Sequence, residues 1–341
     1  MRLNRRAILA ALSNILLVVH VQAADQIPSL SYQRGGQQLN EIPVAELHLP
    51  TVTAQRWLKV SDTEMQAESP AFDREGNLLF VEVFGGQVLK VDKQKRLSVL
   101  VQKNALGSAG LAIHKDGRLY VAGLGDIRAP GNVTIYQPDG SGAQTLIGVD
   151  KNFVVDDLVF DKAGGFYFTD FKGTSTQPTG GVYYVTPDGQ STVPILPKLA
   201  IPNGIALSPD GKTLWVTEFA TGLLHRIELK DAQTIAPFGE GIVYRFNGPS
   251  PDSMRVDADG NLYVAMYSQG RVLVLNPNGH PIGQILIPGR EKGHYLRSTS
   301  LAIKPGTNEL YLVANDGDLG GGAVIFRAKG FARSLSLYSH Q

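Results

Sequence analysis

A repeated pattern of apolar runs and turn glycines constrains the fold of this chain more than any other feature. The stretch PDSMRVDADGNLYVAMYSQGRVLVL, residues 251–275, contains short apolar runs separated by turns with glycine, which is typical of consecutive antiparallel strands. Five other stretches repeat the plan: AFDREGNLLFV, AIHKDGRLYVA, VFDKAGGFYFTD, ALSPDGKTLWVTE and AIKPGTNELYLV. The equivalent glycines are spaced by 41, 47, 47, 49 and 46 residues and are Gly76, Gly117, Gly164, Gly211, Gly260 and Gly306.

A period of this length, with about four strand-sized runs in each unit, predicts an all-β protein, a six-bladed β-propeller. Helical repeats have similar periods, but these units lack apolar residues at helical spacing over the length of a helix. No low-complexity linker divides residues 55–341, so we predict one propeller domain there. The run Gln55–Lys59 precedes the first repeat, and we expect it to add an outer strand to the last blade and so close the ring.

The N-terminal residues do not follow the repeat. Arg2, Arg5 and Arg6 precede a mainly apolar stretch, and Val21-Gln22-Ala23 resembles a cleavage site, so residues 1–23 are predicted to be a signal peptide. The apolar stretch is short for a membrane span, although an uncleaved anchor is the alternative. The run NRRAIL, residues 4–9, also resembles a twin-arginine export signal. We expect an exported, periplasmic protein with no stable membrane association after cleavage.

Residues 24–54 are mixed and polar, and we expect an extension that crosses one face of the ring, with a short helix near Val44–Leu47. The whole chain has 341 residues and a formal net charge of +1, without a basic cluster outside the N-terminus, which argues against a nucleic-acid partner. We expect a monomer. The absence of cysteine excludes disulfides, cysteine nucleophiles and thiolate metal sites.

One position of the repeat concentrates oxygen-bearing side chains. Eight residues before the turn glycines stand Glu68, Ala109, Asp156, Asn203, Asp252 and Ser298. Residues at one phase of a propeller repeat lie at one height on the channel wall, so three carboxylates and an amide should converge near the axis. Like charges in a cleft raise one another's pKa, and a divalent cation removes that conflict. Oxygen donors alone favour a hard ion such as Ca²⁺, which predicts one central channel metal site.

Two alternatives accompany this prediction. Asp and Asn are also frequent in loops because their side chains bond to nearby backbone, so a single such residue would indicate only a turn. A propeller with a purely structural calcium could also be a non-catalytic binding protein, and such a role predicts an exposed aromatic patch on one face. Several carboxylates concentrated at the axis favour chemistry instead.

Several long stretches also resemble a known family. They are VDDLVFDKAGGFYFTDFKGTSTQPTGGVYYVTPDG, NGIALSPDGKTLWVTE, PDSMRVDADGNLYVAMYSQGRVLVLNPNGHPIGQILIPGR and GHYLRST. They are similar to the bacterial drug-responsive lactonases of the senescence-marker-protein/gluconolactonase superfamily, which are six-bladed propellers. The likeness runs from about Leu49 to the C-terminus and is densest from Val155 onward. It implies a calcium-dependent hydrolase that opens lactones, which are cyclic esters.

The resemblance also implies roles for particular residues. The family's channel calcium ligands correspond here to Glu68, Asp156, Asn203, Asp252 and Ser253. Asp252 matches the position assigned as proton donor, and Asp157 lies where a second acid stands beside the metal. The four residues Glu68, Asp156, Asn203 and Asp252 are those that the repeat phase already singled out.

The chain departs from its relatives at a second calcium site. One of its two segments reads Ala129-Pro130-Gly131, and the other reads Asp150-Lys151-Asn152-Phe153, with a lysine where a hydroxyl would be expected. A lysine ammonium is a poor neighbour for Ca²⁺, so we do not expect full occupancy of this second site.

Lactone hydrolysis requires carbonyl polarisation, an activated water and protonation of the leaving alkoxide. A metal can stabilise the oxyanion, and we expect Asp157 or Asp252 to handle the protons. Among the histidines, His294 precedes the last inner strand and is a candidate substrate contact at the channel mouth. His225 is expected to be structural and His114 to be a surface turn residue. No G-x-S-x-G motif is present, which argues against a serine hydrolase.

Overall fold

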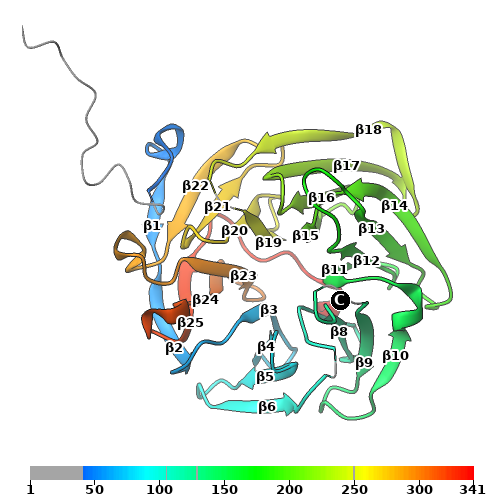
Figure 1. Cartoon of the computed structure of the whole chain (residues 1–341), viewed down its shortest axis with the longest axis horizontal. Coiled ribbons are helices and arrows are strands. Elements are labelled where there is room, and N and C mark those ends of the chain that lie inside the picture. The colour runs from blue at the N-terminus through cyan, green and yellow to red at the C-terminus, as the bar shows by residue number, and fades with distance from the viewer. Residues whose placement is uncertain (1–40, 105, 128–129, 249) are drawn as a thin grey trace, which may run out of the picture. The chain divides into compact units, whose positions relative to one another are not determined.

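The computed structural model describes residues 41–104, 106–127, 130–248 and 250–341. In these ranges the strands form six sheets arranged around a central axis, as Figure 1 shows. The expected all-β, six-bladed propeller is therefore confirmed. The predicted signal peptide, residues 1–23, and residues 24–40 of the predicted extension lie outside the described residues. None of the helices in the described ranges is long and apolar enough to cross a membrane.

Each blade contains consecutive strands that pair antiparallel, and the first of these lies nearest the axis (Figure 1). Blade 1 contains β3 (Ala67–Phe72), β4 (Leu78–Glu82), β5 (Gln87–Val91) and β6 (Leu97–Val101). Blade 2 contains β7 (Gly110–Ile113), β8 (Leu119–Gly123), β9 (Asn132–Tyr136) and β10 (Gln144–Ile147). Blade 3 contains β11 (Val155–Phe160), β12 (Phe166–Asp170), β13 (Gly180–Val185) and β14 (Thr192–Leu199).

The later blades follow the same plan. Blade 4 contains β15 (Pro202–Leu207), β16 (Thr213–Glu218), β17 (Leu223–Asp231) and β18 (Thr234–Arg245). Blade 5 contains β19 (Pro251–Val256), β20 (Leu262–Met266), β21 (Arg271–Leu275) and β22 (Pro281–Leu286). Blade 6 contains β23 (Arg297–Ile303), β24 (Glu309–Asn315) and β25 (Ala323–Lys329). Short 3-10 helices are η2 (Val44–Glu46), η3 (Val149–Lys151), η4 (Arg290–Lys292), η5 (Gly317–Leu319) and η6 (Tyr338–His340).

The two N-terminal strands complete the last two blades. β2 (Gln55–Ser61) pairs antiparallel with β25 and is the outer strand of blade 6, so the expected ring closure is confirmed. β1 (Thr51–Thr53) pairs in parallel with β22 as a fifth strand of blade 5. The described end of the extension, residues 41–54, therefore runs along the outer edge of blade 5 rather than across a face of the ring. Its short helix lies where the sequence predicted one.

The turn between the first two strands of a blade requires glycine. Gly260 has φ +84°, a left-handed conformation that residues with a Cβ atom rarely adopt. Gly164, at the equivalent position, has φ +96°, and a Cβ atom there would lie 2.5 Å from the Tyr338 hydroxyl. The repeated glycine follows from this backbone geometry, which explains why it marks every blade.

The core lies between neighbouring blades. Tyr263 of β20, Leu312 of β24 and Phe326 of β25 belong to one buried cluster that joins blades 5 and 6. Burial of such a side chain contributes roughly 1.5–3 kcal/mol. The blades therefore stabilise one another as a closed ring, and their inner strands are held at fixed heights along the axis.

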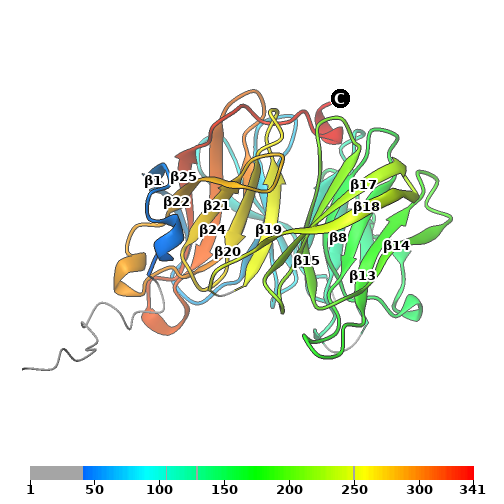
Figure 2. The same cartoon turned by 90° about the horizontal axis from the view of Figure 1, so that it is seen from above.

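The last twelve residues close the end of the channel where the turn glycines lie. They cross this end of the ring, at the upper edge of Figure 2. Tyr338 packs against His114 of blade 2 and Phe160 of blade 3, and Arg74 of blade 1 donates to the Ser339 carbonyl. A mainly apolar cavity of about 120 Å³ lies beneath this segment. The polar residues of interest lie at the opposite end.

Candidate active site

The predicted site residues lie at the start of the inner strands. Glu68 is in β3, Asp156 in β11, Asn203 in β15, and Asp252 and Ser253 are in β19. All five are buried, with at most 8% of the surface of each exposed. The structure therefore places these side chains at one end of the channel wall, opposite the C-terminal segment.

A β-bulge recurs where these side chains lie. The register between the first and second strands shifts between Glu68 and Ala71, between Val155 and Leu158, and between Pro251 and Met254. β15 and β23 carry the same irregularity near their starts. A bulge bends the strand and re-aims its side chains, and bulges are frequent beside active sites. Here it frees two consecutive residues, such as Asp156 and Asp157, from strict alternation.

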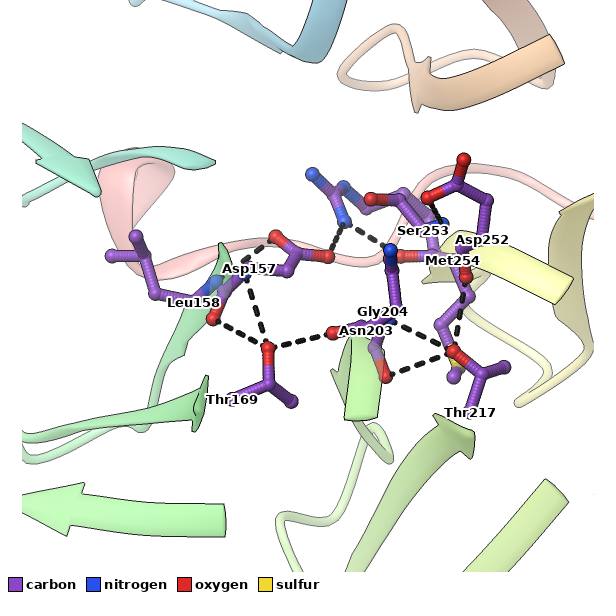
Figure 3. Close-up of polar contacts among 10 residues, drawn as sticks. Asp157, Leu158, Thr169, Asn203, Gly204, Thr217, Asp252, Ser253 and Met254 are labelled. Carbon is purple, nitrogen blue, oxygen red and sulfur yellow. Dashed lines mark hydrogen bonds and ion pairs between the residues drawn. The ribbon is translucent and has the colours of Figure 1, made fainter. Parts of the chain in front are cut away.

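Two buried threonines hold the backbone of the site, as Figure 3 shows. The hydroxyl of Thr169 in β12 accepts from the Asp157 N–H at 3.2 Å and donates to the Asn203 carbonyl at 2.7 Å. The hydroxyl of Thr217 in β16 donates to the Asp252 carbonyl at 3.0 Å, and it accepts from the N–H that follows Asn203 at 2.8 Å. Each threonine links its own blade to the next one, so the spacing between the acidic strands is fixed.

The carboxylates influence one another's ionisation. Burial raises the pKa of Asp156 well above its ordinary value of 3.8, and the charges of Asp252 and Asp157 add to the rise. Burial likewise raises the pKa of Glu68, again with contributions from Asp252, Asp156 and Asp157. Burial raises the pKa of Asp252, while the Ser253 N–H opposes the change. The four acids therefore lie within one another's electrostatic range.

The donor set suits a hard cation. Asp156 Oδ2 and Asn203 Oδ1 are buried without a hydrogen-bond partner in the described part of the chain. Such orphaned oxygens are costly unless a bound group satisfies them. All the side-chain donors are oxygens, which fits Ca²⁺. Even so, no three Asp, Glu or His side chains of the described ranges stand close enough together to form a metal site by themselves. The acids share an electrostatic field without forming a closed set of ligands.

Asp157 is held more tightly than its neighbours. Its Oδ2 pairs with Arg255 Nη1 at 3.0 Å, and its Oδ1 accepts from the Leu158 N–H at 2.9 Å. Only 1% of Asp157 is exposed. Arg255 also donates to the Met254 carbonyl at 2.6 Å, so its guanidinium is fixed. The carboxylate that sequence comparison placed beside the metal is thus an oriented ion-pair partner of blade 5.

The rim of this end carries aromatic side chains at one repeat position. Phe171, Phe219 and Tyr267 each follow the second strand of blades 3, 4 and 5 directly. Neighbouring rings have centroids 6.1 Å and 5.8 Å apart. At the equivalent position of blade 6 stands Asp316 instead, whose side chain is fully buried and pairs with His294 Nδ1 at 2.9 Å. His294, the predicted substrate contact, thus lies at the same end as the acids.

The remaining sequence candidates lie elsewhere. Asp150 and Lys151 pair loosely at 3.5 Å with most of both side chains exposed, and Ala129 lies outside the described residues. His225 of β17 lies between Glu218 and Glu240, at 3.3 and 3.0 Å, which is the structural role expected for it. His114 is not an exposed turn residue: it is partly buried and packs against Tyr338.

Comparison with known proteins identifies the family of this chain. A model of the SMP-30/gluconolactonase/LRE-like region matches residues 66–314. A lactonase, drp35, of Staphylococcus saprophyticus is 49% identical over 92% of this chain and 98% of its own length. The chain belongs to the SMP-30/gluconolactonase/LRE-like family. The drp35 lactonase of Staphylococcus aureus is 45% identical over 94% of the chain and 100% of its own length.

Solved structures of this family share the fold. A calcium-binding protein, regucalcin, from Agrobacterium tumefaciens superimposes with a TM-score of 0.68 and 18% identity, over 84% of this chain and 98% of its own. A gluconolactonase from Xanthomonas campestris gives a TM-score of 0.65 and 22% identity, over 80% and 89%. At these identities the likeness shows the propeller. The family resemblance that the sequence indicated is confirmed.

Sequence reasoning missed four supporting residues. Thr169 and Thr217 have a visible signal, because FTD and VTE occupy the same phase in two repeats. Arg255 and Asp316 have none, since each acts through a contact that only the folded ring creates.

Proposed function

We propose that this member of the family is a lactonase that hydrolyses cyclic esters at the acidic end of the channel. The observation that carries the proposal is the buried set of oxygen donors with two orphaned atoms, Asp156 Oδ2 and Asn203 Oδ1. It stands in a chain 49% identical to a protein named lactonase. A scaffold has no need to bury mutually repelling acids at its axis, because their desolvation is unfavourable.

The residues proposed to hold a calcium ion are Glu68, Asp156, Asn203, Asp252 and Ser253. When bound, the ion would polarise the lactone carbonyl and offset the charge of the oxyanion. The second family site is proposed to be weak or empty, since the Lys151 ammonium lies 3.5 Å from Asp150.

Two carboxylates, Asp252 and Asp157, are proposed to act in proton transfer. The Ser253 N–H holds Asp252 Oδ1 at 3.0 Å, which orients the carboxyl group as a proton donor to the leaving alkoxide. Asp157 is held by Arg255 and by its own strand. The negative charge of Asp157 would stabilise a proton carried by the attacking water or by Asp252.

The proposed setting is an exported protein. Residues 1–23 are proposed to be removed on export to the periplasm, after which a monomeric propeller remains without membrane association. This localisation is tested by fractionation of cells that express the full chain, with N-terminal sequencing of the product. A product that is found in the membrane fraction and still begins with residues 1–23 would contradict it.

Hydrolysis of a panel of lactones tests the activity. The mature protein, Asp252→Ala and the surface control Asp188→Ala would be assayed on substrates that range from aromatic to sugar lactones. We expect ring opening by the mature protein and by Asp188→Ala, and a loss in Asp252→Ala. If no lactone is opened although the protein is folded, the non-catalytic binding protein becomes the better account.

A further inference from the structure

A histidine–aspartate pair stands at the acidic end of the channel, outside the proposed ligand set. His294 Nδ1 lies 3.0 Å from Asp316 Oδ1 and 2.9 Å from Asp316 Oδ2. The side chain of Asp316 is fully buried, whereas 42% of the His294 side chain is exposed. The pair thus joins a buried, fixed carboxylate to an imidazole that reaches solvent.

The surroundings of Asp316 fix the imidazole. The Tyr295 N–H donates to Asp316 Oδ1 at 2.7 Å, and the Gly321 N–H donates to Oδ2 at 2.7 Å. Both oxygens of Asp316 act as acceptors of backbone N–H groups, and this geometry favours a hydrogen on Nδ1 of His294. Nε2 of the neutral ring is then an unprotonated acceptor. Such an arrangement, a base oriented by a carboxylate at its other nitrogen, is common among histidines that transfer protons.

Hydrogen bonds connect this position to the channel acids. Gln66 Nε2 donates to Glu68 Oε1 at 3.4 Å, and Asn315 Nδ2 donates to Gln66 Oε1 at 2.6 Å. Asn315 is the residue directly before Asp316. Amides do not titrate, so the link shows proximity rather than a proton path. Asp316 therefore follows directly on a hydrogen-bonded chain that ends at Glu68, and the pair lies at the same end of the ring as the acids.

The repeat position leads to the same placement. In blade 5 the position of Asp316 is taken by Tyr267, and an isolated bridge joins Tyr267 to Arg297 at the start of β23. Arg297 in turn pairs with Asn315. Burial raises the pKa of Tyr267, and the charges of Asp252 and Glu68 add to the rise. The blade 5 side of this rim, at Tyr267, thus lies within the field of the acids.

Lactone hydrolysis must release a proton. Water adds its oxygen to the carbonyl carbon, the ring C–O bond breaks, the alkoxide oxygen takes one proton, and the acid product ionises and releases another. The channel acids are at most 8% exposed, so they exchange protons with bulk solvent poorly. A half-exposed imidazole at the same end is chemically suited to this exchange, because one ring nitrogen can accept a proton and release it to solvent.

We propose that His294 is the proton-exchange group of the site, taking up at Nε2 the proton that hydrolysis releases and passing it to solvent, with Asp316 as its positioning residue. This inference rests on the proposed lactonase function. It adds a proton-transfer role to a residue whose position in the sequence suggested only a substrate contact.

The test measures kcat in dilute, non-imidazole buffer for the calcium-loaded protein, His294→Ala, His294→Gln and Asp316→Asn. Loss of a positioned proton-transfer group typically costs about 100-fold or more. We expect a fall of that order in both His294 variants with little change in KM, and recovery in His294→Ala when free imidazole is added. His114→Ala is the matched control, since His114 pairs with Asp116 at 2.8 Å at the other end of the channel, and it should keep the full rate.

Two readouts separate this role from a structural one. The ¹⁵N shifts of His294 should show the Nδ1–H tautomer in the unsubstituted protein and a mixture in Asp316→Asn. If His294→Ala keeps the full rate, or folds but gains nothing from imidazole, the relay is overturned while lactonase activity stands. If the unsubstituted protein opens no lactone, the proposed function itself fails and the relay falls with it.

Discussion

Arg271 and Glu46 form an ion pair in the interior of the protein, between blade 5 and the N-terminal extension. Nη2 of Arg271 lies 2.6 Å from Oε2 of Glu46, although the two atoms are not aligned as a hydrogen bond. Both side chains are at most 3% exposed. Tyr244 also donates to Glu46, at 2.9 Å, and Gln284 accepts from Arg271, also at 2.9 Å. A buried ion pair therefore holds the extension against blade 5 of the ring.

Removal of one partner should destabilise the fold. Glu46→Ala leaves the Arg271 guanidinium buried and unpaired, which typically costs about 3–5 kcal/mol. Denaturant unfolding of the two proteins measures the difference. Asp62→Asn breaks the exposed Lys59–Asp62 pair and should leave the midpoint unchanged. Equal midpoints for Glu46→Ala and the unsubstituted protein would mean that the extension does not depend on this pair.

The two buried threonines should matter for both stability and the site. Thr217→Val keeps the shape but removes the hydroxyl between the Asp252 carbonyl and blade 4, and an unsatisfied buried group costs about 1–3 kcal/mol. We expect a lower free energy of unfolding together with weaker calcium binding by calorimetry. Thr213→Val, at the other end of the same strand and only partly buried, is the control. Unchanged calcium affinity in folded Thr217→Val would show that the threonine only stabilises the ring.

Asp157 and Arg255 can be separated by substitution. Asp157→Asn removes the charge beside the metal ligands, and we expect kcat to fall by roughly 100-fold if the carboxylate acts in proton transfer. Arg255→Gln should also lower kcat, because Asp157 Oδ2 loses the partner that orients it at 3.0 Å. Steady-state kinetics on one lactone at saturating calcium decides between the roles. Full activity in Asp157→Asn would leave this carboxylate a purely structural function.

The ion pair around His225 predicts a pH dependence of stability. Burial opposes ionisation of His225, but its bonds to Glu218 and Glu240 outweigh burial and raise the pKa above the ordinary 6.5. This stabilisation is therefore fully present below pH 6.5 and is lost as the pH rises through the higher pKa of the folded state. Burial likewise opposes ionisation of Glu218, yet His225 and the Ala200 N–H lower its pKa below 4.5, so its own contribution is lost in acid.

The pH dependence of stability is measured by unfolding the unsubstituted protein and His225→Gln at about pH 5 to 9. This range extends to both sides of the ordinary histidine pKa. The difference in free energy of unfolding between the two proteins should be largest at the acidic end of the range and shrink toward the basic end. A difference that grows with pH would contradict the assigned ion pair.

The sequence was sufficient for the fold because its signals are local and repeated. The left-handed turn at Gly260 requires glycine, and short apolar runs on both sides require strands. Six copies at one period then leave few arrangements other than a ring. The positions of Glu68, Asp156, Asn203 and Asp252 at one end follow from the same period, since residues in phase stand at one height.

The rest of the site depends on contacts between blades, and no local pattern encodes those. Arg255 of blade 5 pairs with Asp157 of blade 3. His294 contacts Asp316 because the loop that contains His294 lies against the end of β24. The bulge that re-aims Asp156 and Asp157 also leaves no mark in the alternation of apolar residues. The predicted path of the extension across a face of the ring is wrong for residues 41–54. No pattern in these residues indicates that Glu46 pairs with the buried Arg271 of blade 5.

Calcium dependence of lactone hydrolysis tests the central claim most directly. The mature protein would be stripped with EDTA, assayed, and assayed again after Ca²⁺ is restored, in parallel with Asn203→Ala and the surface control Asp188→Ala. We predict that activity disappears with the chelator and returns with Ca²⁺ in the unsubstituted protein and in the control, but not in Asn203→Ala. Full hydrolysis after complete removal of calcium would contradict a metal-assisted site at the start of the inner strands.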